Sequence, residues 1–144
     1  MSIKQISVFL ENSRGQLDEM AALLAANDID LRALSLAETR DFGIARMIVD
    51  DAYATVNVLQ SNRFVARFTP VLAYAVPDEP GGLSHLLAAF TKAEVDIEYM
   101  YAFLGAGSTG KAYMIFRVAD PEKAEEALGR MGYACLTQDQ IAVI

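Results

Sequence analysis

The sequence contains very few of the residues that build metal sites and disulfides. Its single cysteine, Cys135, cannot close an intramolecular disulfide, and one cysteine with one histidine, His85, cannot form a zinc site. No apolar run approaches the ~20 residues that span a bilayer, and no apolar block typical of a signal peptide follows the first residues. We therefore expect a cytoplasmic protein that has no disulfide and no metal cofactor.

Positive charge is also scarce. Twelve Lys and Arg residues stand against nineteen Asp and Glu residues, which leaves a net charge of -7. An acidic surface repels phosphate backbones and anionic headgroups, so we expect no binding to nucleic acid or to membranes. With 53% apolar and 22% charged residues, the 144-residue chain is typical of a packed globular protein of one domain or two very small ones.

A catalytic constellation is missing as well. The sequence offers no Ser/His/Asp set, no paired carboxylates in an apolar pocket and no metal-ligand spacing. The stretch Gly105–Gly110 matches the dinucleotide-binding pattern G-x-G-x-x-G, but the residues from Lys111 onward alternate as a strand. Phosphate binding at such a loop requires a helix directly after the glycines. We expect a hairpin loop there, no bound cofactor and no enzymatic activity.

What the chain does contain is an internal repeat. Residues 8–17 align with residues 74–83, and residues 29–31 align with residues 95–97, both at an offset of 66. Later in the two copies the offset grows to 69, as the second copy has gained three residues. We place this insertion in the glycine-rich stretch.

Each copy is expected to consist of strand, helix, strand, strand, helix and strand, because apolar residues recur first at the period of a strand and then at that of a helix. In the first copy, the elements are expected at residues 6–10, 17–24, 31–37, 44–49, 52–60 and 64–68. In the second copy, they are expected at residues 72–76, 83–90, 97–103, 111–118, 121–131 and 133–136, with a further extended segment at 141–144. Two such βαββαβ units predict an α+β protein with ferredoxin-like domains at residues 1–70 and 71–144, in which two helices cover one face of each antiparallel sheet. Because units of ~70 residues are marginal alone, we expect the copies to pack together and the chain to form a homodimer.

Both copies contain a polar turn in which a glycine opens a helix. The turns are Asn12–Leu17 and Asp78–Leu83. Unpaired backbone N–H groups at a helix start can hold a small carboxylate, and glycine lets a ligand approach the backbone closely. Asn12 or Asp78 could accept hydrogen bonds from an ammonium group. The same residues also suit an ordinary helix start, and the pattern alone leaves both interpretations open.

These turns resemble the signature of ACT domains, which are small regulatory modules that bind amino acids. The signature consists of Asn or Asp, a variable residue, Pro-Gly, a variable residue and Leu, with an Asn- or Asp-Ile-like pair at the start of the second strand. Asp78–Leu83 and Asp96–Ile97 match it fully. Asn12–Leu17 and Asp30–Leu31 match it except that Arg14 replaces the proline. The resemblance covers nearly the whole chain and extends to free-standing tandem ACT proteins, which are similar to the regulatory small subunit of acetolactate synthase.

The resemblance implies a non-catalytic regulatory protein that binds an amino acid where the turn of one domain faces the second strand of a neighbouring domain. Backbone N–H groups would hold the carboxylate, and the Asn or Asp would orient the ammonium group. The ligand-binding residues that it implies in the turns are Asn12, Ser13, Gly15, Gln16, Leu17, Asp78, Glu79, Gly81, Gly82 and Leu83. Those that it implies in the facing strands are Asp30, Leu31, Asp96, Ile97 and Tyr99.

Two alternative functions stay open at this point. The chain could be a regulatory subunit that docks on a metabolic enzyme without a ligand of its own, which Arg14 in place of proline favours. It could also be a small enzyme on the same fold, with a site centred on Tyr99, Tyr101 or His85, because unrelated functions share this scaffold.

Overall fold

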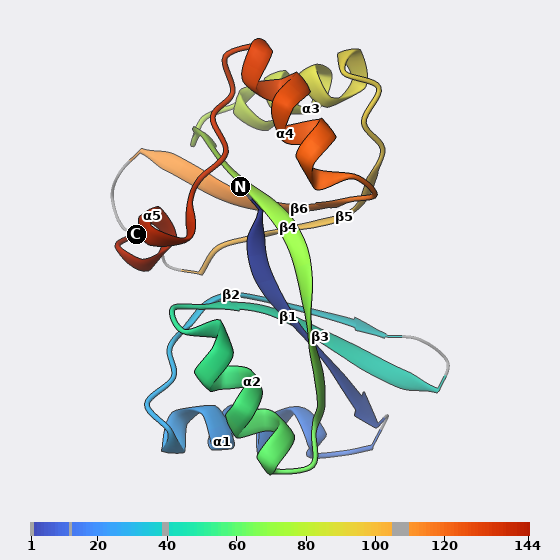
Figure 1. Ribbon diagram of the computed structural model, residues 1–144, viewed down its shortest axis with the longest axis vertical. Coiled ribbons are helices and arrows are strands. Elements are labelled where there is room, and N and C mark those ends of the chain that lie inside the picture. The colour runs from blue at the N-terminus through green and yellow to red at the C-terminus, as the bar shows by residue number, and fades with distance from the viewer. Residues whose placement is uncertain (1, 12, 39–40, 105–109) are drawn as a thin grey trace. The chain divides into compact units, whose positions relative to one another are not determined.

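The computed structural model describes residues 2–11, 13–38, 41–104 and 110–144. The chain divides into two compact units (Figure 1). The first unit is Lys4–Thr69, and the second is Pro70–Ile144 with Met1–Ile3. Both units combine helices with antiparallel strands, which confirms the predicted α+β class. Compactness does not establish independent folding, so domains at residues 1–70 and 71–144 stay a prediction.

The first unit has the predicted order of elements. They are β1 (Ile3–Glu11), α1 (Gln16–Ala26), β2 (Leu31–Glu38), β3 (Phe42–Val49), α2 (Ala52–Ser61) and the beginning of β4 (Val65–Pro77). Its strands hydrogen bond in the order β2-β3-β1-β4, and α1 packs beside α2 (Figure 1). The buried core contains Ile6, Val8, Leu10, Met20, Leu24, Ala45, Met47, Val49, Ala52, Val56, Leu59 and Ala66.

The strand register decides which segments of the first unit lie close together. Glu11, the last residue of β1, pairs with Phe42 at the beginning of β3, and Glu38 at the end of β2 pairs with Gly43. One end of the unit therefore contains the end of β1, the start of α1, the end of β2 and the start of β3. The start of β2 lies at the other end, where Leu31 pairs with Val49.

The second unit continues from β4. Its elements are the later part of β4, α3 (Gly82–Lys92), β5 (Ile97–Ala102), β6 (Lys111–Val118), α4 (Pro121–Arg130) and α5 (Gln138–Ala142). The strands hydrogen bond in the order β4-β6-β5, and α3 packs beside α4 while α5 lies apart from both (Figure 1). Asp120 caps α4, because its carboxylate accepts a hydrogen bond from the N–H of Lys123. As predicted, a strand and not a helix begins at Lys111; residues 105–109 of the glycine-rich stretch lie outside the described residues.

The end of the chain differs from the prediction. Residues 133–136 form no strand, and the segment expected to be extended at 141–144 overlaps helix α5. Thr137 and Gln140 form a capping box, in which each side chain accepts a hydrogen bond from the backbone N–H of the other residue. The helix also buries Ile141 completely. Capping and burial together outweigh the strand propensity of the apolar terminal residues.

One predicted break in the chain is also absent. The strands expected at residues 64–68 and 72–76 form the single strand β4, and Pro70 lies within it. Proline cannot donate a hydrogen bond, so within a sheet it is tolerated only where its nitrogen needs no partner.

The repeat is visible in the backbone of both units. Asp28 and Glu94, which are 66 residues apart, both adopt the left-handed conformation, with φ values of 56° and 58°. Arg63 and Gly132, which are 69 residues apart, do the same with φ values of 69° and 91°. The backbone therefore follows the same path in both copies, with the change of offset that the sequence predicts.

No helix among the described residues is long and apolar enough to cross a membrane.

Candidate functional site

The two strand-to-helix turns have the same backbone conformation. Gly15 precedes α1 with φ 90° and ψ -6°, and Gly81 precedes α3 with φ 92° and ψ -13°. L-residues adopt this region only with strain, whereas glycine adopts it freely. Glycine therefore allows the left-handed backbone conformation through which the chain enters both helices.

Three backbone hydrogen bonds recur in the turns at the offset of 66. They run from the N–H of Ser13, Gln16 and Glu19 to the carbonyls of Glu11, Ser13 and Gly15, and from the N–H of Glu79, Gly82 and His85 to the carbonyls of Pro77, Glu79 and Gly81. The next amides of the helices, on Leu17 and Asp18 in α1 and on Leu83 and Ser84 in α3, donate no hydrogen bond to any described residue. Because these amides lie at the positive end of a helix dipole, they can bind an anion such as a carboxylate.

A hollow of about 270 Å³ lies beside the first turn, entirely within the first unit. Its walls are formed by Leu10, Glu11, Ser13, Gln16, Leu17, Leu36, Ala37, Glu38 and Gly43. The turn supplies one side of the hollow. The end of β2 and the start of β3 supply the other side, as the strand register requires. The leucines provide an apolar surface, while Ser13, Gln16 and the carboxylates provide polar groups.

The second turn is closed more tightly. A Cβ atom added to Gly82 would lie 2.1 Å from the carbonyl oxygen of Pro77, so α3 begins directly against the end of β4. The equivalent residue of the first copy is Gln16, which is half-buried and lines the hollow beside the first turn. The His85 ring also lies close to the second turn, with Cε1 3.9 Å from a Cβ atom added to Gly81. The first turn is therefore the more open of the two.

Most of the predicted residues of the first turn line this hollow, but the predicted strand residues do not. Ser13, Gln16 and Leu17 are lining residues, and Gly15 sets the turn. Asn12 lies outside the described residues. Asp30 and Leu31 are found at the opposite end of β2, about 20 Å away along the strand. Since the predicted partner strand belongs to a neighbouring domain, the proposed contact with it stays a prediction.

The predicted residues of the second copy divide in the same way. Asp78, Glu79 and Gly81 are exposed in the turn, whereas Gly82 is buried and Leu83 is half-buried. The strand residues lie at the other end of the unit.

There Asp96 is exposed at the edge of a separate hollow of about 310 Å³, between the end of α3 and the start of α4. Ile97 is half-buried, and the half-buried ring of Tyr99 stacks against Tyr101 at 6.5 Å between centroids.

Sequence reasoning missed the strand side of the first hollow. Leu36, Ala37, Glu38 and Gly43 line it although no motif includes them. One signal was available: the repeat aligns Gly43 with Ala112, so the first copy lacks a side chain at the position where the second has one. A missing Cβ at this position widens the first hollow.

Two ionisable side chains of the second unit have a pKa that burial raises. Burial raises the pKa of Tyr74, whose hydroxyl has no hydrogen-bond partner among the described residues. Burial likewise raises the pKa of Cys135. A nucleophilic thiol needs a lowered pKa, so Cys135 is poorly suited to catalysis. Within the described ranges, no cluster of His, Cys, Asp and Glu side chains could hold a metal ion.

Solved structures share this fold. A protein from Bacteroides thetaiotaomicron is similar over 100% of this chain and 98% of its own, with 35% identity and a TM-score of 0.90. The regulatory subunits of aspartate kinase from Thermus thermophilus and Thermus flavus match 88% of this chain, with 16% identity and TM-scores of 0.61 and 0.57. The matches cover 91% and 90% of those subunits. None of the curated proteins matches the sequence.

The sequence also matches the family model described as an ACT domain pair, over residues 1–142. This match covers both copies of the repeat and both glycine-opened turns. The chain therefore belongs to the ACT domain family, as a pair of ACT domains.

Proposed function

We propose that the chain is a non-catalytic regulatory protein that binds an amino acid at the first strand-to-helix turn. The observation that carries this proposal is the hollow of about 270 Å³ between that turn, the end of β2 and the start of β3. Its volume suits a small metabolite, because pockets for drug-sized ligands begin at roughly 300 Å³. Membership of the ACT family, whose domains are regulatory modules, supports the same function.

The lining of the hollow complements each part of an amino acid. The amide of Leu17, which lines the hollow and donates to no described residue, binds the carboxylate at the positive end of α1. The carboxylate of Glu38 attracts the ammonium group, and Leu10 and Leu36 contact an apolar side chain. Charge-assisted hydrogen bonds of about 1.5–3 kcal/mol each support micromolar to millimolar binding, or about -8 to -4 kcal/mol, once ordering costs are subtracted.

The difference between the copies favours the first turn over the second. Gly82 lets α3 begin directly against Pro77, whereas the equivalent Gln16 lines the hollow of about 270 Å³. Gly43 leaves room that Ala112 occupies in the second copy. Of the two turns in each chain, we therefore expect the first to bind an amino acid and the second to bind none.

Titration with each of the twenty amino acids, followed by calorimetry and thermal unfolding, tests the proposal. A ligand at 100 times its dissociation constant adds about 2.7 kcal/mol to the free energy of unfolding. If no amino acid releases binding heat or raises the melting temperature, the proposal is wrong. Capture of a metabolic enzyme by a protein that binds no amino acid would instead support the docking subunit.

Two matched variants locate the site. A Cβ atom at Gly43 would lie 3.6 Å from Leu36 Cδ1 and 3.7 Å from the Ala37 carbonyl, so Gly43→Val places its methyl groups in the hollow without backbone overlap at Cβ. We expect this variant to weaken binding at least tenfold, and Ala112→Val in the second copy to leave it unchanged. The opposite pattern would place the ligand at the second turn.

A further inference from the structure

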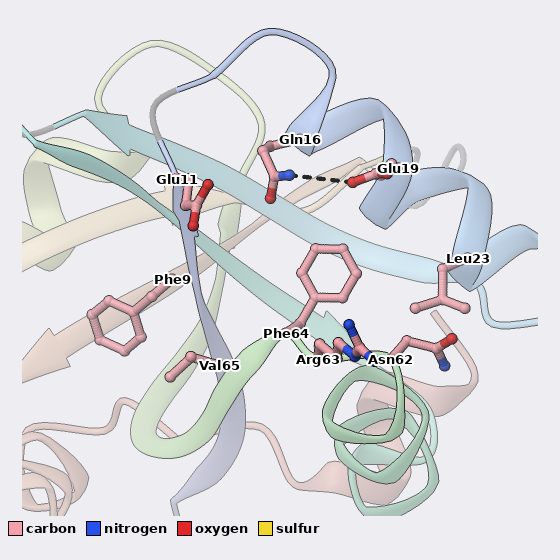
Figure 2. Close-up of a pocket in the computed structure, with 9 residues that line it drawn as sticks. All are labelled: Phe9, Glu11, Gln16, Glu19, Leu23, Asn62, Arg63, Phe64 and Val65. Atoms are coloured by element: carbon pink, nitrogen blue, oxygen red, sulfur yellow. Dashed lines mark hydrogen bonds between the residues drawn. The ribbon is translucent and has the colours of Figure 1, made fainter.

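A larger hollow, of about 460 Å³, also lies beside the start of α1 (Figure 2). It is formed by the end of β1, by α1 and by the segment that joins α2 to β4, all within the first unit. Its lining residues are Phe9, Glu11, Gln16, Glu19, Leu23, Asn62, Arg63, Phe64 and Val65. Glu11 and Gln16 also line the smaller hollow, but the remaining residues do not, so a ligand here would contact a different set of groups.

The polar residues of this larger hollow are specific to the first copy. The repeat aligns Glu11, Gln16, Glu19, Asn62 and Arg63 with Pro77, Gly82, His85, Met131 and Gly132. By contrast, the ring of Phe64 corresponds to the ring of Tyr133, and both pack against the core of their unit. Since the second copy forms the same backbone without these polar side chains, the fold itself does not require them.

Arg63 gives the clearest example. Its φ of 69° lies in the left-handed region, where a long side chain is strained and glycine is not. The second copy has Gly132 at this position, with a φ of 91°. The guanidinium of Arg63 forms no hydrogen bond or ion pair with another described residue. Arginine at this position therefore lowers stability locally and leaves its charge available at the hollow.

The charged groups are arranged around one aromatic ring. Figure 2 shows Glu11 and Glu19 above the ring of Phe64 and Arg63 below it. The side-chain amide of Gln16 donates a hydrogen bond to the exposed Glu19 carboxylate at 3.2 Å. The hollow thus offers two carboxylates and one guanidinium, separated by an apolar surface.

We propose that this larger hollow binds a basic amino acid. Its complement is a small molecule with two cationic groups and one carboxylate, which describes a basic α-amino acid. Arg63 binds the ligand carboxylate in the paired geometry that guanidinium and carboxylate groups favour. Glu11 and Glu19 bind its two cationic groups, and Phe64 contacts the methylene chain. The site shares only Glu11 and Gln16 with the smaller hollow, so one chain can respond to two amino acids.

Calorimetry with L-arginine, L-citrulline and agmatine tests each contact. Citrulline has the shape of arginine without the side-chain charge, and agmatine lacks the carboxylate. We expect L-arginine to bind and both analogues to bind at least tenfold more weakly. Arg63→Gly should weaken L-arginine at least tenfold and leave agmatine unchanged, while Glu19→Gln should weaken L-arginine at least fivefold. Glycine suits the backbone at position 63, so the melting temperature of Arg63→Gly should not fall.

Three results would overturn this site. The first is no binding heat with L-arginine up to 10 mM, a dissociation constant that corresponds to a binding free energy of about -3 kcal/mol. The second is equal binding of L-arginine by Arg63→Gly and by the unaltered chain, and the third is loss of L-arginine binding in Gly43→Val alone. The last result would assign L-arginine to the smaller hollow and so support the proposed function while excluding this one. The chain could also bind another amino acid but no L-arginine, and Gly43→Val could abolish that binding. This result would likewise support the proposed function and exclude the site in the larger hollow.

Discussion

Glycine has two separate structural roles in this chain. At Gly15 and Gly81 the backbone enters the left-handed region, so the requirement is conformational. At Gly82 the φ value is ordinary and the requirement is space, because the Pro77 carbonyl lies where a Cβ atom would be. Sequence reasoning could predict the first role from the turn pattern, but the second depends on how closely a helix packs on a strand.

We predict that Gly82→Ala lowers the free energy of unfolding by about 1–3 kcal/mol, because α3 must move away from β4 to admit the methyl group. Urea denaturation measures this change. Gly129→Ala is the matched control: this exposed position of α4 has no atom within 4 Å of an added Cβ, and alanine favours helices by up to about 1 kcal/mol. A neutral result for Gly82→Ala would contradict the packing described for the second turn.

A second prediction at the residue scale concerns pH. Burial raises the pKa of Cys135 in the folded state, so its thiol ionises first in the unfolded chain, above a pH of about 8.5. The stabilising contribution is complete below that pH and is lost as the pH rises toward the folded-state pKa. We expect the free energy of unfolding to decrease above pH 8.5. Cys135→Ala should show a smaller decrease over the same range, and an equal slope would exclude Cys135 as the cause.

Among the elements, α5 shows most clearly what local patterns miss. The sequence ends in apolar residues that favour a strand, but Thr137 and Gln140 satisfy the first amides of a helix. Ile141 then contributes its burial to that helix. The predicted strands and helices elsewhere were confirmed where periodicity was strong, whereas this short element depends on a cap and on one tertiary contact.

We expect Thr137→Ala to destabilise α5 by about 1 kcal/mol, because the side-chain acceptor of the capping box is lost. Amide hydrogen exchange should become faster at Ile141 and Ala142. Thr91→Ala in α3 is the control, since its hydroxyl only donates back to the Leu87 carbonyl at 3.2 Å within the helix. Unchanged exchange in α5 would show that burial of Ile141 alone maintains the helix.

At the scale of the whole molecule, the repeat and its fold could be predicted because they rest on local signals: a glycine turn, an alternating strand and a change of offset. The hollows could not be predicted in the same way. The smaller one depends on the register that brings Gly43 beside Leu10, and the larger one on the segment from Asn62 to Val65 returning to α1. Such contacts join residues that are far apart in the sequence.

The two units should respond differently to a ligand. With an amino acid whose binding Gly43→Val weakens present at 100 times its dissociation constant, we expect hydrogen exchange to slow in α1 and at the end of β2, but not in α3. The physical reason is that the proposed site is the hollow between the first turn, the end of β2 and the start of β3. Hydrogen exchange monitored by mass spectrometry measures this, and equal protection of α3 would contradict the difference between the turns.

The common backbone of the two copies has an evolutionary consequence. After a gene segment duplicates, the chain carries two versions of the same scaffold, and selection can act on each separately. The second copy now has the compact residues Gly82 and Gly132, while the first has an amide and a charged side chain, Gln16 and Arg63, at the corresponding positions. Divergence between the halves of one polypeptide can therefore create new ligand specificity without any new fold.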